Sequence, residues 1–463
     1  MLNNDGSHGL HEVVQNALPV SHAAARASAR SWSLGLLGWA VSFGLALWLM
    51  VAWGASTGVN NDFTQNVWLP SRLVLNGVDP YQPSRTQVDL ALGSYASIFQ
   101  TFNSGDSYNF IYPMWVALAF TPFAMLPLGM ALALWRAANL LLLIWGVLRI
   151  LKSSGAAFRS ARAPAIAATV LTLFLALIYR ESILTIILGQ FSIIEFALLA
   201  AVWGYLARRS NTDPASRRAL ILGDVLVGVA LAVLATKPQA VGLPVLLLGL
   251  WAISRRRWVI PGAAVSSLAL LLLGPLVAFP SSLQSWISVV AGGQAGSQTS
   301  VSASVWGVSY QWLGGNPSWV WFALVLSLIG LVALVPHWRR DLLDRTAPVP
   351  ISLALTLCIN SVISPYMLGY EHVLLLFPAL LMLAAAGLPD EQGGRQWTQW
   401  RMAVYGWMAA LPFVLVAVQA GLGGKEYPVI VQSLSMLALV CVARFRWSEP
   451  AVDTVRSAVS ANG

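Results

Sequence analysis

The sequence predicts an all-α polytopic membrane protein with about 12 transmembrane helices, within a range of about 11–13. Three observations lead to this fold class. Of the 463 residues, 57% are hydrophobic and only 10% are charged, whereas a soluble domain carries about 25% charged residues. Several apolar runs exceed the roughly 18 residues that indicate a transmembrane helix. The 21 tryptophans suit the long membrane–water boundaries of such a protein.

Thirteen apolar segments follow one another along the chain. They cover residues 33–54, 110–128, 129–148, 163–179, 183–207, 219–236, 238–253, 258–279, 317–336, 348–364, 370–388, 401–421 and 427–444. The segment 110–128 contains three prolines, which interrupt helices, so we expect it to cross the bilayer only in part. Twelve complete spans then remain, an even number that places both termini on one side.

Basic residues in the short loops predict that this side is the cytoplasm. Basic clusters precede the first segment and recur at 208–218, 255–257, 337–345 and 444–446. The chain is therefore divided into a cytoplasmic N-terminal tail (1–32), a transmembrane domain (33–444) and a cytoplasmic C-terminal tail (445–463). The long loops 55–109 and 280–316 are expected on the extracytoplasmic side of the plasma membrane, where function is expected to concentrate.

The first outer loop begins with "GVNNDFTQNVWLP", which carries a single acid, Asp62. Residue chemistry alone leaves two interpretations: a solvated loop acid, or a functional carboxylate that accepts the proton of an attacking hydroxyl. Phe63, Val67 and Trp68 are expected to lie against lipid, and Pro70 is expected to break the helix.

In the second outer loop, apolar residues of "SSLQSWISVV" at 281–290 fall on one helical face, which predicts an interfacial helix.

Polar residues near the outer ends of other segments also have two interpretations each. Lys237 in "LATKPQAVGLP" either binds an anionic group such as phosphate or extends its ammonium to the membrane surface. Gln190 in "ILGQFSIIEF" either bonds to a neighbouring helix or meets a sugar. Glu371 and His372 in "YEHVLLLFP" either hold a substrate or cap the start of a helix.

Several other functions are disfavoured by the sequence. It contains neither a glycine-rich phosphate loop nor an Asp-x-Asp pair, so a soluble nucleotide-sugar site is not expected. Its five histidines are scattered without the spacing of metal ligands, and we expect no metal and no cofactor. The net charge of +9 comes from short loops and reports topology, so no nucleic-acid partner is expected.

Five short motifs, in their order along the chain, resemble a known family. They are "NNDFTQNVWLPSRLVLNGVDPY", "FIYPMWVALAFTPFAMLP", "GQFSIIEFALLA", "ATKPQAVGLPVLLL" and "SPYMLGYEHVLLLFPALL". Together they resemble glycosyltransferase family 87, the polyprenol-phosphate-mannose-dependent mannosyltransferases with the GT-C fold, over about residues 33–390. The resemblance implies a GT-C-like domain with interfacial helices in the first outer loop, at 62–77 here.

The resemblance also implies an activity. Such an enzyme inverts the anomeric centre as it moves a sugar, here mannose, from a polyprenyl-phosphate donor to a lipid or glycan acceptor. Asp62 matches the catalytic acid of the family's first outer loop and would act as the base. Lys237, with Arg180 and His372, would offset the charge of the donor phosphate. Further candidate substrate-binding residues are Asn61, Asp79, Tyr81, Asp106, Tyr112, Gln190, Gln239 and Glu371.

Other functions stay open on the sequence alone. A polytopic transporter or lipid flippase would place polar residues through the middle of the membrane and show paired broken helices. Here the informative polar residues gather near the outer ends of the segments, which favours chemistry at the membrane surface. A GT-C transferase for another sugar, such as arabinose, and a non-catalytic protein with the same fold are the remaining alternatives.

Overall fold

The computed structural model describes residues 62–96, 110–154, 163–209, 217–291, 299–343, 349–385, 395–423 and 425–447. All of them belong to the second of the two units into which the chain divides, Met1–Thr57 and Gly58–Gly463. The predicted first span at 33–54 and two candidate site residues, Asn61 and Asp106, lie outside the described residues. Every regular element in the described ranges is a helix, as predicted.

Four described helices are long and apolar enough to cross a membrane. They are Leu128–Ser154, Val259–Val277, Ser318–Leu343 and Gln399–Gly421. The pair Ala165–Ile178 and Arg180–Leu188, bent by 53°, makes a fifth if it is counted as one span. Five further apolar helices are shorter, at 10–17 residues. The protein is therefore a helical, multi-pass membrane protein, and the described helices give four to five candidate crossings rather than twelve.

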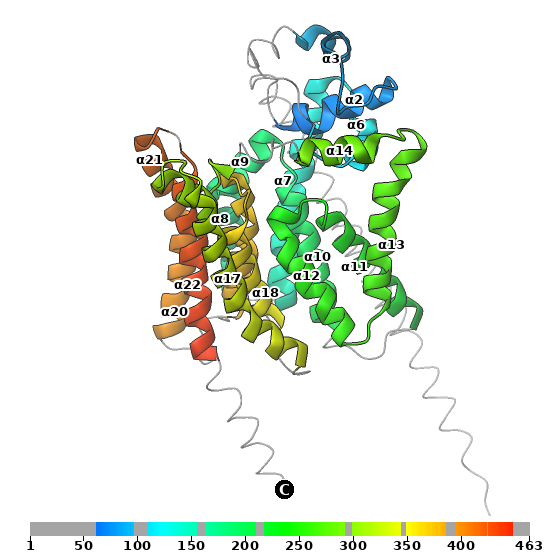
Figure 1. The fold of residues 1–463 in the computed structure, drawn as a ribbon. Helices are drawn as coiled ribbons and strands as arrows, with labels where there is room; N and C mark the ends of the chain where they lie inside the picture. Colours follow the sequence, from blue (N-terminus) through cyan, green and yellow to red (C-terminus); the bar gives the residue numbers. More distant parts are fainter. Residues whose placement is uncertain are drawn as a thin grey trace, which may run out of the picture. The chain divides into compact units, whose positions relative to one another are not determined.

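A set of short helices gathers at one end of the long helices (Figure 1). It consists of η1 (Thr64–Trp68), α2 (Leu69–Leu75), α3 (Arg85–Leu92), η2 (Gly93–Tyr95), α5 (Met114–Ala119), α6 (Thr121–Ala124) and α14 (Ser282–Ala291). We call this end the cap end. Phe63 and Phe123 of this end pack against Trp135 of α7. The Trp286 indole N–H donates to the carbonyl of Ile111 at 3.0 Å, which ties α14 to the segment before α5.

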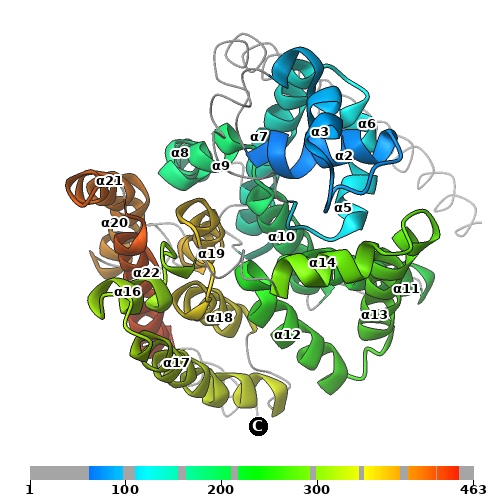
Figure 2. The same cartoon turned by 45° about the horizontal axis from the view of Figure 1, so that its top comes forward.

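The remaining helices form the rest of the protein. In chain order they are α7 (Leu128–Ser154), α8 (Ala163–Ile178), α9 (Arg180–Leu188), α10 (Ser192–Arg209), α11 (Arg217–Leu234), α12 (Pro238–Ser254), α13 (Val259–Leu273), η4 (Gly274–Val277), α16 (Val305–Trp312), α17 (Ser318–Leu343), α18 (Val349–Ile363), η5 (Gly369–Leu375), α19 (Leu376–Ala385), α20 (Arg395–Ala409), α21 (Leu411–Gly421), η6 (Tyr427–Val429) and α22 (Ile430–Trp447). Figure 2 shows α20, α21 and α22 on one side, α11 and α13 on the other, and α10, α12, α18 and α19 between them.

The predicted segment 183–207 is wrong as a single span. The structure divides it into α9 and α10, with a break after Gly189, which adopts a left-handed conformation (φ 73°). The residues between the predicted segments 163–179 and 183–207 are helical as well, because α9 begins at Arg180 directly after Tyr179. The break places Gln190 within hydrogen-bond distance of Asp62.

The helix after Asp62 agrees with the expected helical character of 62–77, but its apolar face does not meet lipid. Phe63, Val67 and Trp68 are at most 3% exposed and pack against α7. Pro70 does not break the helix either. The wider π-turn of η1 runs directly into α2, and Pro70 takes one of the first positions of α2, where a proline is tolerated because its missing N–H has no helical partner.

The proline-rich segment 110–128 contains only α5 and α6, of six and four residues. At 1.5 Å per residue neither can span a bilayer, which agrees with the expectation that this segment crosses only in part. The helix predicted at 281–290 is confirmed as α14, with Ile287 and Val290 about half exposed at 54% and 45%.

Candidate active site

Asp62 stands one residue before the N-cap of η1 and is half-buried. Its Oδ2 accepts a short hydrogen bond from the side-chain amide of Gln190. Phe63, directly after it, is fully buried and its ring centroid lies 5.5 Å from that of Trp135 on α7. The acid therefore has a fixed position at the edge of a packed aromatic core, which is not the environment of a solvated loop acid.

The break between α9 and α10 places Gln190 beside Asp62. A left-handed residue such as Gly189 is a common way to end a helix, and here the position also needs a small residue. A Cβ on Gly189 would come within 2.5 Å of the Phe63 Cβ. The carbonyl of Gly189 accepts a hydrogen bond from the Trp135 indole at 2.8 Å. Glycine is thus required by both the backbone conformation and the close approach of the Asp62 segment.

Lys237 immediately precedes α12 and is 3% exposed. Its Nζ lies 2.7 Å from Glu371 Oε1, donates to Ser192 Oγ at 3.3 Å and lies 5.2 Å from the ring centroid of Tyr370. The ammonium does not extend to the membrane surface. An ammonium has three N–H donors; Glu371 and Ser192 occupy two, so one remains to meet a ligand oxygen.

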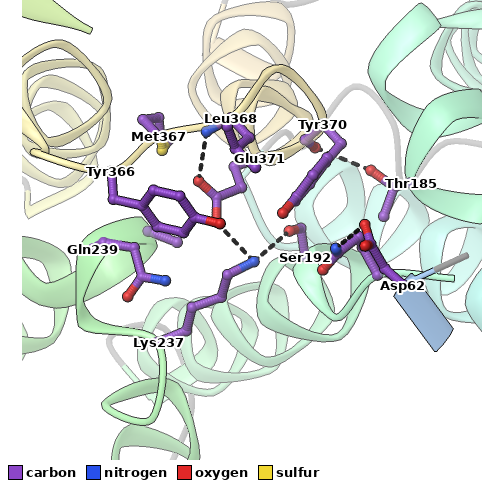
Figure 3. A network of polar contacts seen from close by, with 12 residues as sticks. Asp62, Thr185, Ser192, Lys237, Gln239, Tyr366, Met367, Leu368, Tyr370 and Glu371 are labelled. Atoms are coloured by element: carbon purple, nitrogen blue, oxygen red, sulfur yellow. Dashed lines mark hydrogen bonds and ion pairs between the residues drawn. The ribbon is translucent and has the colours of Figure 1, made fainter. Parts of the chain in front are cut away.

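Glu371 takes the capping role that its sequence left open and also pairs with a lysine. It caps the start of η5, where its Oε2 accepts the backbone N–H of Leu368 at 2.9 Å, and its other oxygen pairs with Lys237. In the view of Figure 3, Tyr370 and Ser192 lie between Lys237 and Asp62. Ser192 starts α10, whereas Tyr370 and Glu371 are neighbours in η5. Segments far apart in the sequence thus meet around this site.

Burial raises the pKa of the Asp62 carboxyl above its ordinary value of 3.8. The Gln190 hydrogen bond and the Lys237 charge oppose this rise, and the Glu371 charge adds to it. These groups act on the two forms of the acid in the usual way: loss of solvent favours the neutral acid, whereas a donor or a cation favours the carboxylate. The result is a carboxylate that binds a proton more readily than a solvated one.

Arg180 and His372, both expected at the donor phosphate, lie in a second polar cluster. Arg180 Nη1 pairs with Glu181 Oε1 at 3.1 Å, and His372 Nδ1 is 3.3 Å from the carbonyl of Leu368. The carbonyl of His372 accepts the hydroxyl of Tyr179 at 3.3 Å. Among the described residues, neither Arg180 nor His372 forms a hydrogen bond or ion pair with Lys237.

The other predicted substrate-binding residues divide into two groups. Tyr112 is buried, packs edge-on against Phe191 at 5.1 Å and interacts electrostatically with Lys237 and Asp62. Gln239 lies beside Lys237 in Figure 3. These two belong to the site.

Asp79 and Tyr81 support the site from the cap end instead. Asp79 Oδ1 accepts the backbone N–H of Tyr81 at 2.9 Å, and the Tyr81 hydroxyl donates to the carbonyl of Tyr112 at 2.7 Å. Burial raises the pKa of Tyr81, so its hydroxyl stays protonated and keeps this bond. Both residues therefore fix the segment that carries Tyr112.

Three residues at the site were not singled out from the sequence: Ser192, Tyr366 and Tyr370. Figure 3 places Tyr366 next to Gln239 and Glu371. The two tyrosines stand in the same short motif as Glu371, "SPYMLGYEH". The motif indicated that this segment could belong to the site. It could not indicate that the Tyr370 ring would face Lys237, which lies more than a hundred positions earlier in the chain.

An acid held by an amide, and a buried lysine paired with a glutamate, lie among apolar helices that can cross a membrane. This arrangement defines a membrane-embedded protein with a buried polar site near one end of its bundle. The chain belongs to glycosyltransferase family 87, whose sequence model matches residues 110–365, more than half of the chain. No curated protein matches the chain significantly, and neither does any solved structure.

The family resemblance expected from the motifs is confirmed, and with it a glycosyltransferase that uses a sugar donor and an acceptor. The matched range includes Tyr112, Gln190, Lys237 and Gln239. Asp62 lies before it and Glu371 after it, so the family match does not cover the two acids that contact those residues.

Proposed function

We propose that the protein is an inverting glycosyltransferase that moves mannose from a polyprenyl-phosphate donor to a lipid or glycan acceptor, with Asp62 as general base. The observation that supports this proposal most is the Asp62–Gln190 hydrogen bond. It holds a half-buried carboxylate close to a buried lysine at the cap end, where a lipid-borne phosphate and a water-facing acceptor can meet.

In the proposed reaction the acceptor hydroxyl attacks the anomeric carbon and gives its proton to Asp62. The bond between that carbon and the phosphate oxygen breaks, and its electron pair leaves with the polyprenyl phosphate. The charge on the leaving phosphate increases by one negative unit as this bond breaks. A donor aimed at that oxygen therefore stabilises the transition state more than the bound substrate.

Lys237 is the proposed donor to the leaving phosphate. Because Glu371 already offsets its charge, the pair supplies an oriented N–H rather than net positive charge. A hydrogen bond from an ammonium to a phosphate is nevertheless of the stronger, charge-assisted kind. The proposal assigns Tyr112, Gln239 and Tyr370 to the walls of the sugar pocket, because a sugar hydroxyl can bond to an amide or a phenol there.

The finer architecture is also proposed. We infer a GT-C-like domain of about 12 spans in the plasma membrane, with the cap end on the extracytoplasmic side. The basic loops at 208–218 and 255–257 support this orientation. A single cysteine introduced at Ser300 should react with an impermeant thiol reagent added to intact cells; reaction only after the membrane is opened would contradict the orientation.

The activity is tested with the purified protein in lipid vesicles. Radiolabelled polyprenyl-phosphate-mannose, -arabinose and -glucose are offered separately with membrane extract as acceptor, and the linkage of the product is read by NMR. The proposal expects transfer from the mannose donor with inversion at the anomeric carbon. Transfer from another donor only, or with retention, would contradict it.

A further inference from the structure

A buried arginine lies in α7, within one of the candidate membrane spans. Arg136 is 1% exposed, and the helix around it, Leu128–Ser154, is apolar. A charged side chain in such a helix is costly and is rarely present without a partner. We therefore expect the Arg136 guanidinium to bond to an acceptor, since such a bond offsets part of the cost of burying the charge.

One partner of Arg136 is the carboxyl end of α9. Arg136 Nη2 donates to the carbonyl of Ile187 at 2.8 Å, one residue before the helix ends at Leu188. The last carbonyls of a helix lack helical partners, and a cation is favoured there by the helix dipole. The preceding residue of α7, Trp135, donates its indole N–H to the carbonyl of Gly189. Two consecutive side chains of α7 thus hold the end of α9.

This fixation extends directly to Asp62. Gln190 follows three positions after Ile187, and its backbone N–H is bound to the carbonyl of Thr185 at 3.0 Å. Its side-chain amide then donates to Asp62. A rotation of the last turn of α9 would carry the Gln190 amide away from the carboxylate. Arg136 resists that rotation through its bond to the Ile187 carbonyl, two residues before Gly189.

We propose that Arg136 is a positioning residue for sugar transfer: it fixes the end of α9, α9 fixes Gln190, and Gln190 orients the Asp62 carboxylate. This inference rests on the proposed role of Asp62 as general base. Arg136 does not touch the substrate. Its effect is on the geometry of the base, and a misplacement of about 1 Å in a reacting group can cost about 10²-fold in rate.

The proposal predicts a kinetic signature. Arg136→Met keeps the bulk of the side chain and suits an apolar helix, so the variant should insert and fold. Its kcat should fall about 10- to 10²-fold with an unchanged KM for the donor. Loss of the Gln190 bond removes a group that favours the charged form of Asp62, so the acid limb of the pH–rate profile should move to higher pH. Lys237 and Glu371, the other charges that act on Asp62, stay in place.

A double-mutant cycle tests the connection. In Gln190→Leu the last link is already absent, so adding Arg136→Met should change kcat less than about 2-fold. Arg136→Lys keeps a donor of similar reach and should recover part of the rate. The matched control is Arg72→Met. Arg72 also donates to a backbone carbonyl, that of Ala124 at 2.8 Å, but its contact is not on α9, and its effect should be the same with and without Gln190.

The outcomes separate the two proposals. An equal loss from Arg136→Met in the wild-type and Gln190→Leu proteins, with an unmoved acid limb, would overturn the positioning role and leave Arg136 as a structural residue. Wild-type kcat in Arg136→Met would overturn it as well. Full activity of Asp62→Asn would instead overturn the proposed base, and this single variant is read independently of the cycle.

Discussion

Removal of the Lys237 ammonium is expected to reduce both the stability of the protein and its use of the donor. The Lys237 and Glu371 side chains are 4% and 0% exposed, and their charged atoms lie 2.7 Å apart. In Lys237→Met the apolar stem is kept, and Glu371 is left buried without its cation. Removal of one member of a buried ion pair costs about 3–5 kcal/mol. We expect about 3 kcal/mol, because Glu371 keeps the Leu368 backbone N–H and can take up a proton.

The double variant Lys237→Met/Glu371→Gln separates stability from function. It removes both charges and leaves an amide oxygen for the Leu368 N–H. Replacement of both members of a buried pair by neutral groups is about neutral for stability, so the midpoint of thermal unfolding should return close to the wild-type value. Sugar transfer should stay low, because the N–H donor to the leaving phosphate is still absent.

The assay combines two measurements in lipid nanodiscs: thermal unfolding followed by tryptophan fluorescence, and initial transfer rates over a range of donor concentrations. Arg85→Met is the matched control, since it breaks an exposed pair with Asp89 at 3.2 Å, which is worth about 0–1 kcal/mol. Wild-type transfer and donor KM in the double variant would refute the role of Lys237 at the donor. Wild-type stability in the single variant would refute the buried pair.

Two further predictions concern the segment around Asp62. Gly189→Ala should lower stability by about 1–2 kcal/mol for the left-handed backbone alone and should lower kcat through displacement of Phe63 and Asp62. The control is Gly406→Ala, because an added Cβ at Gly406 would meet open space. Equal behaviour of the two variants in unfolding and transfer would contradict this reasoning. The pH dependence follows from the raised pKa of Asp62: a base works only when ionised, so kcat/KM should fall as the pH drops through a value above 3.8. A pH–rate profile that stays flat down to the ordinary range of a solvated carboxyl would argue against Asp62 as the base.

Much of the fold follows from the sequence because lipid leaves few choices to the backbone. Every N–H and C=O group in a bilayer has to be paired internally, so a long apolar run becomes a helix. The apolar segments therefore predicted helices such as α7, α17 and α18 close to where they lie. The ends and breaks were harder to predict. The break at Gly189 depends on contact with Phe63, far away in the sequence, and an apolar pattern cannot distinguish a face that meets lipid from one that meets protein.

The candidate site was predictable residue by residue but not as pairs. The sequence identified four polar groups near the ends of apolar segments: Asp62, Gln190, Lys237 and Glu371. A polar group is costly there, which makes each of them a candidate functional residue. That Gln190 would bind Asp62 and Glu371 would bind Lys237 depends on tertiary packing. His372 was assigned to the same group because it follows Glu371 in the chain. Its ring bonds to the backbone of Leu368 and Gly369, at the start of its own helix η5, and interacts electrostatically with Arg180.

The central claim is that Asp62 is the general base of sugar transfer, and one substitution tests it most directly. Asp62→Asn keeps the shape of the side chain and an oxygen for the Gln190 amide, but it cannot accept the proton of the acceptor. A general base contributes about 10²–10⁴-fold in rate, so transfer from radiolabelled polyprenyl-phosphate-mannose should fall by that factor while unfolding and donor binding stay near wild type. Asp89→Asn, which changes a partly exposed acid of α3, should transfer normally. Transfer by Asp62→Asn at the wild-type rate would contradict the account.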